Sequence, residues 1–304
     1  MSSIATKLEP EAQLSDYVSA EELKGYLERS DARAFWMTGF NLAIIAAAFA
    51  LPVLWLNPLT LSLSVLLLGG RQLGLAVLYH DCAHSVLFKT KSFNELFGHW
   101  MFGGLMNTSL ASYRDYHLGH HRFTGTVDDP DLEMANAYPA TKASMRRKIV
   151  RDATGQTGFK SMKAQMSRFG LKRNAPFLVS HAVMLGLLSL SGIAWTYLLW
   201  WVAFLFVYQV ITRIRFMSEH AVAIDRLSVD PRDNTCTTVV TWWERLFVGP
   251  NFVNYHLEHH LRAAIPCYHL RRFHQLLKAR NYYGDKACFS YGYANVLRKA
   301  TQPA

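Results

Sequence analysis

Charge is absent from two long stretches of this 304-residue sequence. No Asp, Glu, Lys or Arg occurs from Phe35 to Gly70, and none occurs from Asn174 to Thr212. One helix crosses the roughly 30 Å hydrocarbon core of a membrane with about 20 residues, so each stretch is too long for one helix and suits two. Turn-forming pairs interrupt the stretches at Asn57-Pro58 and at Ser191-Gly192. The sequence therefore predicts two helical hairpins, with four membrane spans, rather than a soluble domain.

The interruptions of the two stretches also lack charge, which fixes the predicted topology. The N-terminus, the middle segment and the C-terminal third must then share one side of the membrane. With 32 Lys and Arg against 22 Asp and Glu, the positive-inside rule makes that side cytoplasmic. We therefore expect a multi-pass protein of a bacterial inner membrane with both termini in the cytoplasm. This topology accounts for the net charge of +10 without nucleic acid as a partner. Arg71 either snorkels to the surface or shows that its helix continues beyond the membrane.

Cysteine is scarce, and the N-terminus lacks the features of a signal peptide. The four cysteines lie far apart without a metal-type pair, which suits a reducing compartment and predicts no disulfide framework. The first 34 residues are acidic and have no basic stretch leading into a short apolar one. Ser19 and Glu22 form a capping-box pattern, which predicts a small helix lying on the cytoplasmic body.

Histidine, by contrast, is abundant and clustered. Eight of the thirteen histidines fall into three groups whose spacings of three and four residues place each group on one helix face. The groups are His80 and His84; His117, His120 and His121; and His256, His259 and His260. A ninth contributor is expected at His220, just beyond the last predicted span. The isolated His99, His181, His269 and His274 are expected to be packing or surface residues.

Nine imidazoles are too many for one first-row metal ion and suit two. The zinc-hydrolase pattern His-Glu-x-x-His is absent, and so is the Glu-x-x-His of soluble di-iron bundles. Haem is disfavoured, because a bis-histidine haem protein places single histidines inside facing spans and only His181 lies within a predicted span. A histidine-rich storage tract is also disfavoured, because such a tract would be contiguous and repetitive. The remaining interpretation is a histidine-rich two-metal site at a membrane surface. The expected metal is iron and the expected co-substrate is O2, because iron changes its oxidation state and zinc does not.

The order of these groups, interleaved with two hydrophobic hairpins, resembles the membrane fatty-acid desaturase superfamily. Supporting residues are Asp128-Asp129-Pro130-Asp131 after the second group and Asn254-Tyr255 before the third, with Pro266 after it. The resemblance covers roughly residues 35 to 280 and is specific for the scaffold and the metal chemistry but weak for the substrate. In acyl-CoA desaturases the first histidine group has four residues between its histidines, whereas His80 and His84 are separated by three. Those enzymes also carry an asparagine four residues before the isolated histidine, where this chain has Phe216. Both differences set this chain apart from acyl-CoA desaturases.

The resemblance also implies which histidines share an iron. One iron would be held by His80, His84, His117, His121 and His259. The second iron would be held by His120, His220, His256 and His260, with its outer position open to water. Acidic or polar neighbours that could hold the ligand rings are Asp81, Glu219, Glu258 and Asn254.

In function, the resemblance implies an O2-dependent lipid desaturase. A lipid or carotenoid hydroxylase or ketolase on the same scaffold is the first alternative, and a non-catalytic membrane metal-binding protein is the second. No dinucleotide-binding fingerprint and no fused cytochrome b5 or ferredoxin segment is recognisable, so electrons must come from an external ferredoxin or cytochrome b5. The ten basic residues between 142 and 173 form either a headgroup-contacting face or a docking surface for that donor.

The expected architecture is all-α. It consists of an N-terminal cytoplasmic helical segment (1–34), a membrane desaturase domain (35–280) and a C-terminal tail (281–304). The domain would combine four transmembrane helices, as two hairpins, with a cytoplasmic helical cap that holds the di-iron site.

Overall fold

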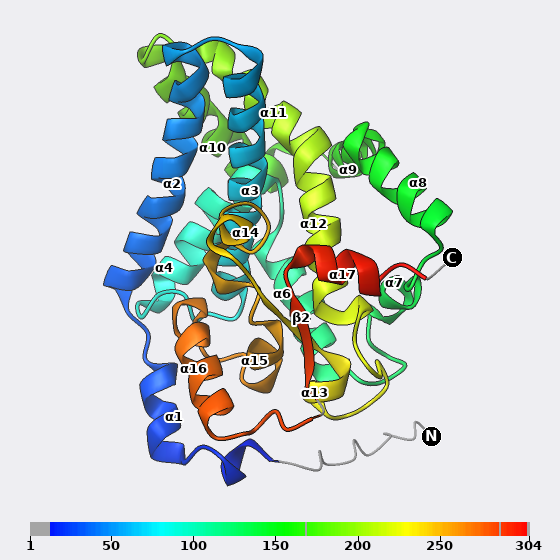
Figure 1. Cartoon of the computed structure of the whole chain (residues 1–304). Coiled ribbons are helices and arrows are strands. Elements are labelled where there is room, and N and C mark those ends of the chain that lie inside the picture. The colour runs from blue at the N-terminus through cyan, green and yellow to red at the C-terminus, as the bar shows by residue number, and fades with distance from the viewer. Residues whose placement is uncertain (1–12, 168, 286, 303–304) are drawn as a thin grey trace.

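The computed structural model describes residues 13–167, 169–285 and 287–302 and is mostly helical. Long helices gather at one end, and short helices form a cap at the other (Figure 1). The expected first hairpin is present as α2 (Asp31–Leu54) and α3 (Pro58–Ala83). Asn57 is the N-cap residue of α3, and its side chain accepts hydrogen bonds from two backbone N–H groups of the first turn. The outer face of α2 exposes Trp36 and Leu54, as expected of a surface that faces lipid.

The second hairpin begins with α10 (Leu171–Leu190) and the 3-10 turn η3 (Ala194–Thr196). The chain then continues as one helix through α11 (Tyr197–Val202), η4 (Ala203–Tyr208), α12 (Gln209–Phe216) and η5 (Met217–Ala221), of which η4 and η5 are π-helical. Within the described residues, three helices are long and apolar enough to cross a membrane, namely Asp31–Leu54, Pro58–Ala83 and Ala194–Ala221. The helix α10 is not among them, so the fourth span stays a prediction.

Arg71 lies inside the long helix α3 and is only 2% exposed. Its guanidinium donates hydrogen bonds to the Asn41 side chain (3.2 Å) and to the backbone carbonyl of Leu246. Gly74 allows the close approach of Asn41, since a Cβ there would lie 2.3 Å from the Asn41 oxygen. Arg71 therefore does not snorkel; α3 continues past it into the cap, and Arg71 joins the helix to the cap.

The cap is built from short helices in three parts of the chain. The first part comprises η1 (Leu14–Asp16) and α1 (Ala20–Leu27), where the predicted Ser19–Glu22 capping box is confirmed. The second comprises α4 (Lys91–Leu96), η2 (Phe97–Phe102), α5 (Gly103–Met106), α6 (Leu110–Phe123), α7 (Leu132–Asn136), α8 (Lys142–Ala153) and α9 (Gln156–Met166). The third comprises α13 (Pro231–Asn234), α14 (Trp242–Phe247), η6 (Pro250–Phe252), α15 (His256–Leu261), α16 (Cys267–Ala279) and α17 (Tyr293–Lys299).

Two short strands correct the prediction of an all-α chain without disulfides. Strand β1 (Cys236–Val239) pairs in parallel with β2 (Cys288–Tyr291), with Cys236 opposite Cys288. The two cysteines form a disulfide across 52 residues of sequence. Sequence spacing could not reveal this pair, because only the strand register brings the two thiols together. Both residues are buried (0% and 4% exposed), which shields the bond from reductants in the surrounding water.

The segment expected to be a C-terminal tail is part of the folded cap. Its described portion contributes β2 and α17. Tyr293 and Val296 of α17 are buried in a cluster with Met217 and Ala221 of η5. The helix that carries His220 is thus packed against the end of the chain. Of the expected N-terminal segment, residues 1–12 lie outside the described residues.

Candidate metal centre

Four helical segments deliver the nine predicted histidines to one place in the cap. The helix α3 carries His80 in its last turn and has His84 as its C-cap residue, while α6 presents His117, His120 and His121. The π-helix η5 supplies His220, and α15 supplies His256, His259 and His260. A π-turn adds a residue to the helical repeat and so rotates the side chains that follow it, a device found often at functional sites.

The nine side chains form two groups, divided as the resemblance implied. The five-histidine group is His80, His84, His117, His121 and His259, and the four-histidine group is His120, His220, His256 and His260. In each group, one nitrogen from every ring lies within 4.8 Å of all the others. The groups adjoin, because the rings of His121 and His260 stack with centroids 4.2 Å apart.

Hydrogen bonds at the outer ring nitrogens orient several of these rings. The Nδ1 of His120 lies 2.8 Å from a carboxylate oxygen of Asp129, and the Nδ1 of His220 lies 3.2 Å from the backbone carbonyl of Asn234. Carboxylate and carbonyl oxygens only accept hydrogen bonds, so Nδ1 carries the proton in both rings. A neutral ring then has a lone pair on Nε2. The two Nε2 atoms face each other at 3.1 Å.

This arrangement fits a bound cation better than a hydrogen-bond network. Two facing lone pairs repel each other unless a positive charge lies between them. Two nitrogens bound at right angles to one ion, with metal–nitrogen bonds of about 2.1 Å, lie about 3 Å apart. The Nε2 atoms of His80, His84 and His260 are buried and have no hydrogen-bond partner. Buried nitrogen atoms of this kind are normally satisfied, and metal ions in the two groups would satisfy them.

Burial keeps the rings in the form that binds metals. It lowers the pKa of His84 to about 2, with the neighbouring His80 adding to the effect. Burial and adjacent histidines also hold the pKa values of His117, His259 and His260 well below the ordinary value. These rings are therefore neutral at physiological pH, and neutral imidazole is the ligand form.

Of the four predicted supporting residues, two contact ligand rings. Asp81 lies 3.1 Å from the Nδ1 of His80 and also accepts the backbone N–H of Cys267 at 2.8 Å. Glu219 lies 3.5 Å from the Nδ1 of His256. Asp81 at the end of α3 and Glu219 on η5 thus orient the rings of His80 and His256.

The other two predicted supporting residues point elsewhere. Glu258 accepts hydrogen bonds from Thr237 (2.5 Å) and His274 (2.6 Å) rather than from a ligand ring. The reason is helical geometry: position 258 faces away from the side of α15 that carries the three histidines. Asn254 instead pairs with Thr238 of β1 through its side chain, at 2.9 Å.

Two supporting contacts were not predicted. Asp129 holds His120, with Asp131 3.6 Å from the same nitrogen, and the Asn234 carbonyl holds His220. The acidic run after the second group was the available signal for Asp129. The Asn234 carbonyl had no signal, because a backbone acceptor depends on the fold of its loop.

The isolated histidines lie outside both groups. His99 is exposed beside Trp100 on η2. His181 is buried, with Tyr197 2.8 Å from one ring nitrogen and the carbonyl of Leu105 3.2 Å from the other. His269 contacts Arg33, and His274 contacts Glu258. Each has a packing or surface role in the structure.

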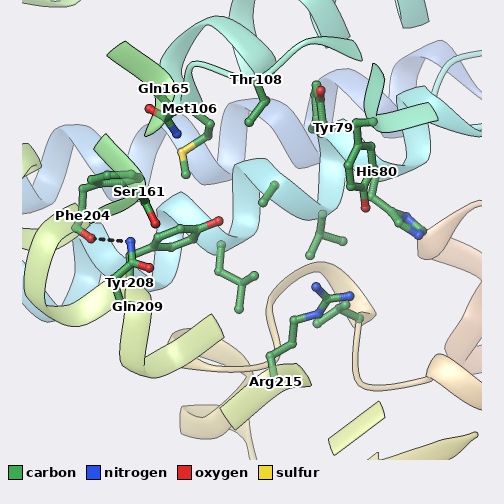
Figure 2. Close-up of a pocket in the computed structure, with 15 residues that line it drawn as sticks. Tyr79, His80, Met106, Thr108, Ser161, Gln165, Phe204, Tyr208, Gln209 and Arg215 are labelled. Carbon is green, nitrogen blue, oxygen red and sulfur yellow. Dashed lines mark hydrogen bonds between the residues drawn. The ribbon is translucent and has the colours of Figure 1, made fainter. Parts of the chain in front are cut away.

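A cavity of about 220 Å³ adjoins the five-histidine group. His80 lies at one end, and Phe204, Tyr208 and Gln209 lie toward the other (Figure 2). The remaining lining residues are Leu73, Ala76, Val77, Tyr79, Met106, Thr108, Tyr113, Ser161, Gln165, Arg215 and Val253. The cavity is therefore apolar along α3, with polar groups where α9 approaches.

Apolar long helices joined to two histidine groups indicate a membrane protein with a metal centre, and the comparisons with known proteins identify the family. The family model "Fatty acid desaturase" matches residues 57–292. The chain belongs to this family.

Several curated desaturases are similar to the chain at a distant level. Dihydrorhizobitoxine desaturase of Bradyrhizobium elkanii is 27% identical over 239 residues, which cover 72% of this chain and 66% of that protein. The sn-1 oleoyl-lipid 12-desaturase of Synechocystis sp. is 26% identical over 285 residues, covering 84% and 78%. The sn-1 oleoyl-lipid 12-desaturase of Anabaena variabilis is 24% identical over 297 residues, covering 87% and 79%. The chain thus spans slightly less than two thirds of the first of these relatives.

Proposed function

We propose that this protein is an O2-dependent di-iron desaturase that introduces a double bond into an acyl chain of a membrane lipid. The observation that carries the proposal is the junction of the five-histidine group with the cavity, since His80 belongs to both. The acyl-lipid desaturases among the relatives support the substrate class. Electrons would come from an external ferredoxin or cytochrome b5.

Irons bound by the two groups would supply the oxidation that removes hydrogen from an unactivated C–H bond. The protein's own residues position that bond. Tyr113 stacks on His117 with ring planes 6° apart and also meets Tyr79, with centroids 5.3 and 5.0 Å away respectively. These rings form a rigid wall beside His80. A shift of about 1 Å in the bound carbon changes such a reaction strongly, so this wall would select the carbon that reacts.

Product analysis tests the proposal. The full chain is expressed in a host of defined lipid composition, and its lipids are compared by mass spectrometry with those of a host carrying His80→Ala. Loss of two hydrogens from an acyl chain is the expected result. Gain of one oxygen would show the hydroxylase alternative, and unchanged lipids with a reduced, iron-loaded protein would contradict enzymatic function on host lipids.

The topology follows from the same proposal, with four spans and both termini in the cytoplasm of a bacterium. Reporter fusions at Asn57 and Gly192 should lie outside the cytoplasm, because each stands between two apolar helices. Fusions at Lys142 and at the C-terminus should lie inside. A cytoplasmic signal from Gly192 would show that α10 does not cross the membrane.

Asp129→Ala should weaken iron binding in the four-histidine group. The carboxylate fixes the tautomer and orientation of His120, and loss of such a support costs about tenfold to a hundredfold in metal affinity. After dialysis against a graded chelator, the variant should lose about one of two irons at a concentration that leaves the wild type loaded. Asp128→Ala, an exposed neighbour, is the matched control. Equal iron retention by both variants would contradict the role of Asp129.

A further inference from the structure

The helix α9 has an inner face that helps to form the cavity wall. Gly158 packs on η4 so closely that a Cβ would lie 2.5 Å from the carbonyl oxygen of Leu205. Ser161 and Gln165 follow on the same face and line the cavity (Figure 2). The side-chain oxygen of Gln165 also accepts a hydrogen bond from Asn107 at 3.4 Å. The position of α9 thus sets the width of the cavity at its polar side.

The outer face of α9 combines apolar and basic side chains. Phe159 and Met166 are 50% and 39% exposed, and Lys160 and Lys163 are exposed between them. The only acid between positions 142 and 173 is Asp152. Asp152 is fully buried and paired with Arg213 of α12. The exposed charge of this region is therefore entirely positive.

This combination fits a membrane surface better than an acidic protein. Helices with exposed apolar residues next to lysines lie in the plane of the headgroups. The chain also leads directly from α9 into α10, whose first residue Leu171 is 74% exposed and whose remaining turns are mainly apolar. Figure 1 shows α8 and α9 beside α12, to one side of the cap. The place where α9 lies is thus the boundary between the cap and the apolar helices.

The cavity reaches the surface next to this helix. Of its fifteen lining residues, Thr108 alone is exposed, and Thr108 follows Asn107, the partner of Gln165. Lys160 adjoins Ser161 in the sequence, and Lys163 is two residues before Gln165. The two lysines therefore lie on the outer face of the helix whose inner face lines the open side of the cavity.

We infer that α9 selects anionic phospholipids as substrates. Lys160 and Lys163 bind the phosphate-bearing headgroup, and the acyl chain passes between α9 and Thr108 toward His80. This inference rests on the proposed desaturase function and adds the headgroup class to it. Basic residues near an anionic surface favour binding by about fivefold each, so a clear preference over zwitterionic lipids is expected.

The test uses the iron-loaded full chain in nanodiscs that contain equal amounts of phosphatidylglycerol and phosphatidylcholine, with distinguishable isotope-labelled acyl chains. The wild type should desaturate the anionic lipid at least about fivefold faster. Lys160→Gln with Lys163→Gln should bring the ratio close to one while iron content is unchanged. Arg146→Gln with Arg147→Gln, an exposed pair on α8, removes the same charge away from the cavity and should keep the preference.

The outcomes separate the two proposals. Desaturation of both lipids at equal rates by the wild type would overturn the headgroup inference and leave the desaturase function standing. Equal slowing of both lipids in the α9 variant, together with slower reduction by a ferredoxin, would show a donor-docking surface instead and also overturn it.

A spin label gives a readout without catalysis. Ala164→Cys places a nitroxide on the exposed face of α9, and the free native thiols Cys82 and Cys267 are buried. The ratio of O2 collisions to collisions with a water-soluble nickel complex should exceed that of a label in water, as expected at headgroup depth. Aqueous exposure of the label would overturn the inference even if neither lipid is desaturated.

Discussion

His220→Ala is expected to abolish O2-dependent turnover and to lower iron content from about two toward one per chain. The His220 ring is buried, and its Nε2 lies 3.1 Å from that of His120 and 3.0 Å from that of His256. Its removal leaves three rings in the four-histidine group. Loss of a supporting residue alone typically costs tenfold to a hundredfold, so loss of a ligand should reduce turnover by at least about a hundredfold.

His99→Ala is the matched control for this prediction. His99 is also an isolated histidine, but it is exposed on η2 and belongs to neither group. Its replacement should leave iron near the wild-type amount. Iron is measured by mass spectrometry of the metal and turnover by lipid analysis, with both variants brought to equal amounts in the membrane. Full iron and full turnover in His220→Ala would mean that the eight clustered histidines hold the metals alone.

Much of the site could be predicted because helices turn sequence spacing into direction. The spacing of three or four residues in each histidine group places the rings on one face, and the structure brings those faces together. The same rule should have excluded Glu258, which lies two positions after His256 and faces the opposite side of α15. Asp81 and Glu219 were predictable because each adjoins a ligand at the end of an apolar stretch.

Other features depend on contacts between distant segments and left no local signal. The Cys236–Cys288 bond follows from the pairing of β1 with β2, two strands too short to predict. The contact between Asp129 and the His120 ring depends on how the loop after α6 folds back. Arg71 could be identified as unusual in an apolar helix, but its partner, the Leu246 carbonyl, lies 175 residues away in sequence.

The cavity itself could not be predicted, since its walls come from α3, α5, α6, α9 and η4 together with residues near η6 and on α12. Because this cavity is the proposed site of the substrate, the second prediction concerns Ala76, which lines it. Ala76 lines the cavity one helical turn before His80 and packs near Val207 and Tyr208. A larger side chain at this position would project into the space between the metal end and Tyr208. The structure therefore offers a site where substrate access can be blocked without touching a histidine.

Ala76→Phe should reduce turnover by at least about tenfold while iron content stays near two per chain. The added ring occupies the path of the acyl chain, whereas His80 keeps its own contact with Asp81. Overpacking costs about 1–3 kcal/mol of stability, so the melting temperature is measured in parallel. Leu66→Phe, on the same helix at a residue 45% exposed, enlarges a side chain away from the cavity and should leave turnover unchanged.

The smaller change Ala76→Val distinguishes a blocked path from general damage. If the cavity holds the chain during reaction, one extra branch should displace the bound carbon by about 1 Å, a distance that alters which hydrogen is removed. A shifted double-bond position, or a mixture of positions, is therefore expected in its products. Unchanged rate and unchanged position in both Ala76 variants would show that the substrate reaches the histidine centre by another route, since a chain lying in this cavity could not avoid position 76.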